Sequence, residues 1–115
     1  MAGETILLVE DDPAVAALLA GLLEEADFTV DGPYRSLTDG AAALARHLPA
    51  GAVLDVRLGA QDAGLLADDL DTYGIPYLFC SGAADAVTHD HPAAPLVPKP
   101  SAARALVPTL HRILH

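Results

Sequence analysis

The sequence is poor in cysteine, in basic residues and in long apolar runs, and each shortage excludes a class of protein. Cys80 is the single cysteine among 115 residues, so no internal disulfide can form. No apolar run approaches the roughly 20 residues that a membrane-spanning helix requires. Residues 1–4 lack the basic segment of a signal peptide. We therefore expect a cytoplasmic protein with no membrane insertion.

Basic side chains are outnumbered by acidic ones. Six Lys and Arg residues stand against sixteen Asp and Glu residues, which gives a formal net charge of −10. A protein that binds nucleic acid directly needs cations to neutralise the phosphates, so this function is not expected. The negative surface favours cations and basic protein surfaces instead. Hydrophobic residues make up 52% of the chain, which indicates one globular domain rather than a disordered segment.

Short apolar runs alternate with segments of helical periodicity along the whole chain. Asp12 is predicted to cap the first helix, and either Thr38 or Asp39 the second. Strands are expected at 5–9, 28–30, 52–56, 75–80 and 96–98, and helices at 13–26, 41–47, 65–73 and 101–114. Residues 83–94 show little pattern. Such alternation predicts an α/β fold, a parallel sheet with helices on both faces.

Polar residues follow four of the expected strands, at the point where each strand ends. Parallel strands present their carboxyl ends at one edge of the sheet, where α/β proteins place their sites. These residues should therefore converge: Glu10 and Asp11 after the first strand, Asp55 at the end of the third, Ser81 after the fourth and Lys99 after the fifth.

This group of residues suits phosphoryl chemistry. Clustered carboxylates, together with a backbone carbonyl and waters, form the oxygen-rich surroundings that Mg²⁺ prefers. The cation would offset the repulsion within the acidic run. A further aspartate, Asp55, can act as a nucleophile toward phosphorus. The Lys99 ammonium and the Ser81 hydroxyl can stabilise the oxygens of the transferred group.

Four segments carry a resemblance to a known family. The segments "ILLVEDDP", "AVLDVRLG", "LFCSG" and "VPKP" occur in this order, at the ends of strands one, three, four and five. With them the chain resembles the receiver domain of two-component response regulators, along nearly its whole length. The resemblance implies a flavodoxin-like, doubly wound sheet of five parallel strands in the order 2-1-3-4-5. It also implies that residues 1–115 form a single stand-alone receiver with no output domain.

The resemblance implies a Mg²⁺ site and a phosphoacceptor. Glu10 and Asp11 would hold the metal together with Asp55 and the backbone carbonyl of Arg57. Asp55 would accept the phosphoryl group from a histidine kinase or a histidine phosphotransfer protein. Asp12 remains a helix cap. The domain would catalyse only its own phosphorylation and dephosphorylation.

Two further residues complete the implied machinery. Ser81 would be the switch hydroxyl and Lys99 the lysine that contacts the phosphoryl group, with a cis peptide before Pro100. Output would be protein binding, onward phosphotransfer or the draining of phosphate from a kinase.

The chain departs from the family pattern in several places. Gly59 stands where a proline is usual, and Leu96 stands where a switch aromatic is common. The segment between Ser81 and Lys99 is short and contains "GAADAVTHDHPAAP", so the fourth helix should be short or irregular. His89 and His91, two apart in this segment, are expected to be solvated rather than zinc ligands.

Two other functions are consistent with parts of this sequence. One is a binding module of the same fold that signals without phosphorylation, which the departures at Leu96 and in "LGAQDAG" favour and the intact Asp55, Ser81 and Lys99 oppose. The other is a phosphohydrolase of the haloacid dehalogenase type. That enzyme needs an acid two residues after its nucleophile, where this chain has Arg57.

Overall fold

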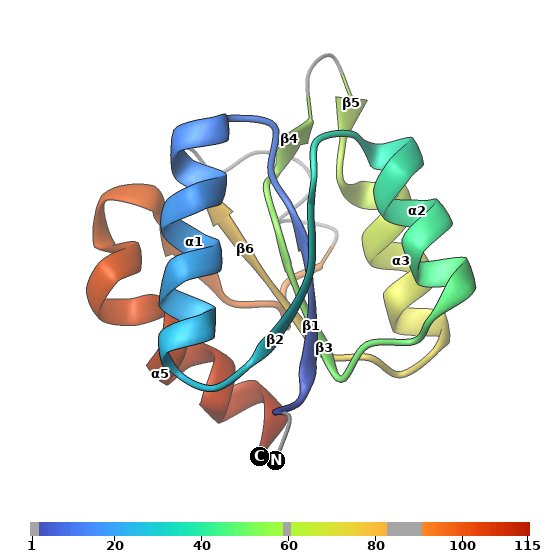
Figure 1. Ribbon diagram of the computed structural model, residues 1–115. Coiled ribbons are helices and arrows are strands. Elements are labelled where there is room, and N and C mark those ends of the chain that lie inside the picture. The colour runs from blue at the N-terminus through green and yellow to red at the C-terminus, as the bar shows by residue number, and fades with distance from the viewer. Residues whose placement is uncertain (1–2, 59–60, 83–90) are drawn as a thin grey trace.

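The computed structural model describes residues 3–58, 61–82 and 91–115, and its centre is a parallel sheet (Figure 1). Five strands lie in the order β2-β1-β3-β6-β7, with every pair parallel. The strands are β1 (Thr5–Val9), β2 (Thr29–Tyr34), β3 (Gly51–Leu54), β6 (Tyr77–Ser81) and β7 (Leu96–Pro98). Counted along the chain, this is the predicted order 2-1-3-4-5.

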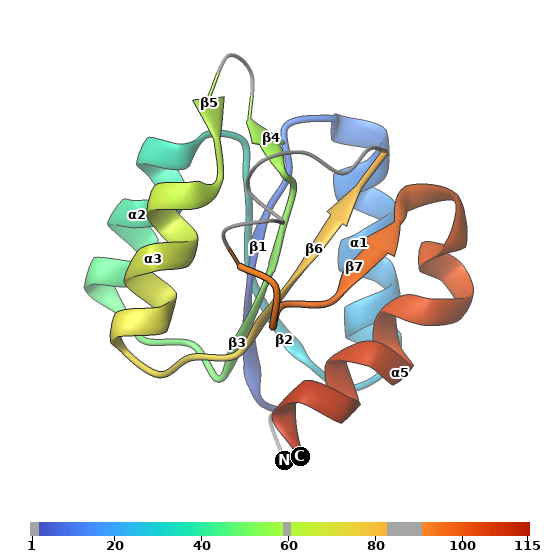
Figure 2. The same ribbon diagram turned by 180° about the vertical axis from the view of Figure 1, so that it is seen from behind.

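Helices cover both faces of the sheet (Figures 1 and 2). The helices are α1 (Pro13–Glu25), α2 (Leu37–Arg46), α3 (Gly64–Thr72) and α5 (Ala102–Leu114), and the short 3₁₀ turn η1 (Lys99–Ser101) precedes α5. α1 and α5 lie on one face, and α2 and α3 lie on the other. In the part of the chain that the structure describes, no helix is long and apolar enough to span a membrane. The predicted α/β fold is confirmed.

The sheet has a hydrophobic core on each face, which explains why its central strands are continuous apolar runs in the sequence. Successive side chains of a strand point to opposite faces. Leu7 joins the core under α2 and α3, whereas Ile6 and Leu8 join the core under α1 and α5. All three are fully buried. A parallel sheet covered on both faces has no solvent-facing side in its central strands, so alternation with polar residues is lost.

Three local expectations were wrong. β2 runs on to Tyr34, because Asp31 pairs with Leu7 and Tyr34 with Val9 of β1, and the turn-like Gly32-Pro33 between them is accommodated by a shift in register. α2 begins earlier than predicted, and its cap is Ser36, whose hydroxyl accepts a hydrogen bond from the Asp39 N–H at 3.1 Å. Ser36 is favoured because its extended backbone lets the hydroxyl reach the third residue of the helix.

The peptide bond between Lys99 and Pro100 was expected to be cis, and it is trans. Among the described residues, the one cis peptide precedes Pro33. Pro100 instead lies within η1, where the Ala102 N–H donates to the Lys99 carbonyl. This tight helical turn joins Lys99 to Pro100 through a trans peptide, and α5 follows at once.

One element was not expected. The two-residue strands β4 (Arg57–Leu58) and β5 (Gln61–Asp62) pair antiparallel and form a hairpin that projects beyond the main sheet (Figure 2). The segment expected to hold a short or irregular fourth helix falls largely on residues 83–90, outside the described residues, so that expectation stays a prediction.

Candidate functional site

Backbone hydrogen bonds fix the ends of β1 and β3 beside each other. The Asp55 N–H donates to the Val9 carbonyl at 2.9 Å, and the Glu10 N–H donates to the Tyr34 carbonyl at 2.8 Å. The ladder therefore continues one residue beyond each strand. Glu10 and Asp55 leave the sheet at the same edge because the two strands are parallel neighbours.

The three predicted carboxylates converge at this edge. One oxygen each from Glu10, Asp11 and Asp55 lies within 4.8 Å of the others. Glu10 is 0% exposed and Asp55 is 4% exposed, while Asp11 is partly buried. Close carboxylates with little solvent repel one another, so the arrangement needs positive charge.

Lys99 supplies part of that charge. Its Nζ lies 3.2 Å from Glu10 Oε1 and 3.4 Å from Asp55 Oδ2. Burial lowers the pKa of Lys99, but the hydrogen bond to Glu10 and the charges of Asp55 and Glu10 outweigh it, so the pKa is raised. The side chain is therefore an ammonium at neutral pH. It reaches the site because η1 follows directly after β7.

Glu10 retains an acceptor that no hydrogen bond in the described structure uses. Its Oε2 accepts from the Asp12 N–H at 3.1 Å and from Lys99 Nζ at 3.4 Å. Its Oε1 is buried and has no hydrogen-bond donor, since Lys99 Nζ approaches it as an ion pair without hydrogen-bond alignment. A buried anionic oxygen without a donor is costly. An acidic cluster with such an oxygen fits Mg²⁺, which takes oxygen ligands.

Asp12 has the role predicted for it. Its side chain accepts hydrogen bonds from the N–H groups of Ala14 at 2.9 Å and Val15 at 3.3 Å, so it caps α1. Of the three consecutive acidic residues, Glu10 and Asp11 thus face the cluster, and Asp12 serves the helix.

Ser81 and Arg57 belong to strands that end or begin near this edge. Ser81 is the last residue of β6, is 7% exposed and pairs with Pro98, the residue before Lys99. Arg57 begins β4, two residues after Asp55. The proposed roles of the Ser81 hydroxyl and the Arg57 carbonyl stay predictions.

Sequence reasoning missed one contact and misjudged one residue. It assigned Glu10 to a metal alone, whereas Glu10 also contacts Lys99; the 89 residues that separate them leave no local signal. It also expected His91 to be solvated. His91 is 8% exposed, because its ring packs against those of Tyr77 and Phe79.

No family model and no curated protein sequence matches the chain. Solved structures do. SdrG from Pseudomonas melonis Fr1, in its BeF3-activated conformation, is 28% identical, with 100% of each chain covered and a TM-score of 0.79. The BeF3-activated N-terminal receiver domain of RstA from Klebsiella pneumoniae is 25% identical, with 96% of this chain and 98% of that chain covered and a TM-score of 0.81.

A third match extends the fold comparison. The CheY-like response regulator receiver domain protein from Methanospirillum hungatei JF-1 is 20% identical, with 97% of this chain and 94% of that chain covered and a TM-score of 0.86. The chain thus has the doubly wound fold of response regulator receiver domains, the class that the sequence motifs indicated. The matches with SdrG and RstA span all or nearly all of both chains, so the resemblance to receiver domains of two-component systems is confirmed.

Proposed function

We propose that this receiver domain accepts a phosphoryl group on Asp55 from a histidine kinase or a histidine phosphotransfer protein, with Mg²⁺ bound. The observation that carries the proposal is the cluster itself. Asp55 is nearly buried, shares its surroundings with Glu10 and Asp11, and has the Lys99 ammonium 3.4 Å from Oδ2. Such a grouping has a nucleophile, a cation site and a fixed positive charge within a few ångströms.

In the proposed reaction an Asp55 carboxylate oxygen attacks the phosphorus of a phosphohistidine. The P–N bond breaks, and the imidazole leaves with the bonding electrons and takes a proton from solvent. Lys99 then contacts an oxygen of the new acyl phosphate, and the Ser81 hydroxyl donates to another. Asp11, Asp55, Glu10 and the Arg57 carbonyl would hold Mg²⁺, which would supply positive charge to neutralise the phosphoryl oxygens.

The comparisons support the same function. Both SdrG and RstA were solved in BeF3-activated form, and this chain aligns with each over nearly its full length. Beryllofluoride is therefore a suitable mimic to try here. We propose that residues 1–115 act as one receiver unit, whose output is protein binding, onward phosphotransfer or the draining of phosphate from a kinase.

The first test is chemical. Incubation with acetyl phosphate and Mg²⁺ should add one phosphoryl group, detected by intact-protein mass spectrometry and lost in Asp55→Asn. The exposed Asp27, at the end of α1, provides a matched control, and Asp27→Asn should be labelled as the wild type is. An adduct that persists in Asp55→Asn, or no adduct on the wild type, would refute the proposal.

A phosphorylation-independent binding module is the rival function. Leu96, 37% exposed at the start of β7, favours it, because an aliphatic side chain has no polar tip with which to report a phosphoryl group. Under this rival, beryllofluoride with Mg²⁺ would leave the amide NMR spectrum of the protein unchanged. Shifts that spread from Asp55 to Ser81 and Lys99, and are absent in Asp55→Asn, would exclude it.

A further inference from the structure

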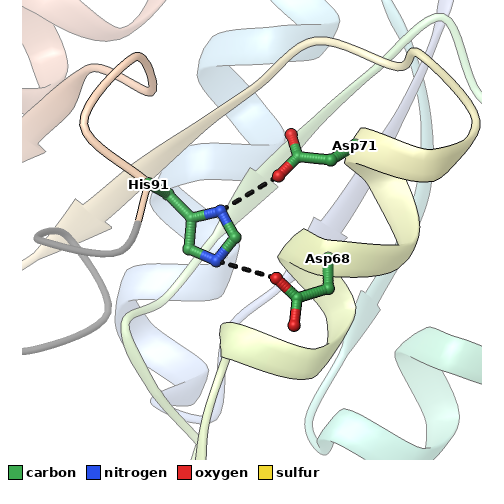
Figure 3. Close-up of side chains that lie close together, drawn as sticks. All are labelled: Asp68, Asp71 and His91. Carbon is green, nitrogen blue, oxygen red and sulfur yellow. Dashed lines mark hydrogen bonds and ion pairs between the residues drawn. The ribbon is translucent and has the colours of Figure 1, made fainter.

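A second cluster of ligand-type side chains surrounds His91 (Figure 3). His91 Nδ1 lies 3.1 Å from Asp71 Oδ2, and His91 Nε2 lies 3.2 Å from Asp68 Oδ1. The Tyr77 hydroxyl lies 2.8 Å from the same Nδ1. The two aspartates come from α3, the tyrosine from β6 and the histidine from the segment that leads to β7.

The cluster joins a buried ring to accessible carboxylates. His91 is 8% exposed. The side chains of Asp68 and Asp71 are 65% and 56% exposed. Asp71 and Tyr77 also line an adjoining cavity of about 410 Å³. An ion can therefore reach the cluster from solvent, and there is room for water beside it.

A count of protons shows that the cluster lacks positive charge. A neutral imidazole carries one N–H, and a carboxylate only accepts. If Nε2 donates to Asp68, the lone pair of Nδ1 faces Asp71 Oδ2. The Tyr77 hydroxyl lies 2.8 Å from Nδ1 and has a single proton, which it can give to only one acceptor. In the other neutral tautomer Nδ1 donates to Asp71, and the lone pair of Nε2 faces Asp68. In either tautomer one ring nitrogen therefore faces a carboxylate oxygen with its lone pair, and a cation between them would make that contact favourable.

We propose that His91 Nδ1 and Asp71 bind a transition-metal ion of the Zn²⁺ class, and that Asp68 orients the imidazole through Nε2. Two ligands that each lie about 2.0–2.2 Å from one ion are separated by about 3.0–3.5 Å at ordinary coordination angles. The Nδ1–Oδ2 separation of 3.1 Å falls in this range. A metal-bound histidine commonly donates its other N–H to a carboxylate, which is the position of Asp68.

The donor set also selects the metal. Imidazole suits Zn²⁺, whereas Mg²⁺ prefers oxygen ligands alone. The site is therefore distinct in chemistry from the acidic cluster at Asp55, and it does not depend on the function proposed for that cluster. Waters from the adjoining cavity would complete the coordination.

The test is calorimetric titration of the tag-free protein with ZnCl₂ in excess Mg²⁺, which keeps the acidic cluster occupied. We expect one Zn²⁺ per chain in the wild type. Asp71→Asn should abolish this binding, and Asp68→Asn should weaken it about tenfold or more, as loss of an orienting carboxylate does. Both aspartates are exposed, so these variants should fold. His47→Gln, which alters an exposed histidine beyond α2, is the matched control and should bind as the wild type does.

Three results would overturn the proposal. The first is Zn²⁺ binding that survives Asp71→Asn, which would place the ion elsewhere. The second is binding lost in Asp55→Asn, which would place it in the acidic cluster. The third is the absence of Zn²⁺ binding to the wild-type protein, which would show that the cluster holds no such ion.

Discussion

At the scale of single residues, the acidic cluster places three carboxylates close together. Glu10, Asp11 and Asp55 lie within reach of one another, Lys99 contacts Glu10 and Asp55, and these last two carboxylates are nearly buried. Such an arrangement is unfavourable for folding, since repulsion between charges is strong where water is scarce. Proteins retain such repulsion where a functional site needs the carboxylates. Variants that change the charge of the cluster should therefore change the free energy of unfolding.

Asp55→Asn should stabilise the protein when divalent metal is absent. The change removes one negative charge from the cluster, while Lys99 keeps its contacts with Glu10. We expect the free energy of unfolding in EDTA to rise by about 1 kcal/mol, the size of an ordinary substitution effect. Urea unfolding followed by circular dichroism measures it. Lys99→Met, which leaves the carboxylates without their cation, should shift the stability in the opposite direction; a fall in both variants would contradict this account.

Cys80 should be inert in the folded protein. Burial, followed by the charge of Glu10, raises the pKa of the thiol to about 11. The thiolate is the reactive form, so at pH 8 Ellman's reagent should label the native protein far more slowly than the urea-unfolded protein. Equal rates in the two states would show that the thiol is accessible.

The raised pKa of the Cys80 thiol also makes the stability of the protein depend on pH. A folded-state pKa raised from 9.0 to about 11 means that the folded protein holds this proton more tightly. The contribution to stability is complete below pH 9 and is lost as the pH rises toward 11. The raised pKa of Lys99 acts with the same sign.

At the scale of elements, helix ends are set by individual residues. Asp12 caps α1, Ser36 caps α2, and Gly74 follows the end of α3 with a φ of +69°. A residue in this left-handed region ends a helix, and glycine adopts it without steric cost. Gly21 is the contrasting case, because it lies inside α1.

Two alanine substitutions should therefore have opposite effects. A Cβ at either Gly21 or Gly74 meets no atom within 4 Å, so only the backbone distinguishes them. Gly74→Ala should lower the free energy of unfolding by about 1 kcal/mol, because φ is positive. Gly21→Ala should raise it by about 0.5–1 kcal/mol through helix propensity. Urea denaturation of both variants provides the comparison, and effects of the same sign would contradict the assigned backbone conformations.

At the scale of the whole molecule, the candidate site is assembled from distant parts of the chain. Glu10, Asp55 and Lys99 come from the ends of β1, β3 and β7 and meet only when the sheet is complete. A ligand of this site binds the folded state and not the unfolded chain, so it must stabilise the fold by mass action.

Mg²⁺ should therefore raise the midpoint of thermal unfolding in proportion to the logarithm of its concentration above its dissociation constant. Asp11→Asn should reduce the rise, because it removes one carboxylate from the cluster. Differential scanning fluorimetry over a Mg²⁺ series measures it, with Asp27→Asn and an equal ionic strength of NaCl as controls. A rise that NaCl reproduces would be screening of the net charge rather than binding.

The sequence by itself determined how the five main strands and the helices alternate along the chain and the edge at which the candidate site lies. Both follow from local causes: apolar periodicity identifies each element, and parallel strands end at one edge. Asp12 as the cap of α1 was predictable for the same reason, since a cap bonds to amides only two and three residues further along the chain, here those of Ala14 and Val15.

The tertiary structure alone decided what depends on distant neighbours. β2 extends through a turn-like stretch because β1 lies beside it, and Lys99 meets Glu10 across 89 residues. His91 is buried because the rings of Tyr77 and Phe79 reach it, which no local pattern records. Contacts of this kind arise only when the sheet and its helices pack, because packing brings together groups that lie far apart in the chain.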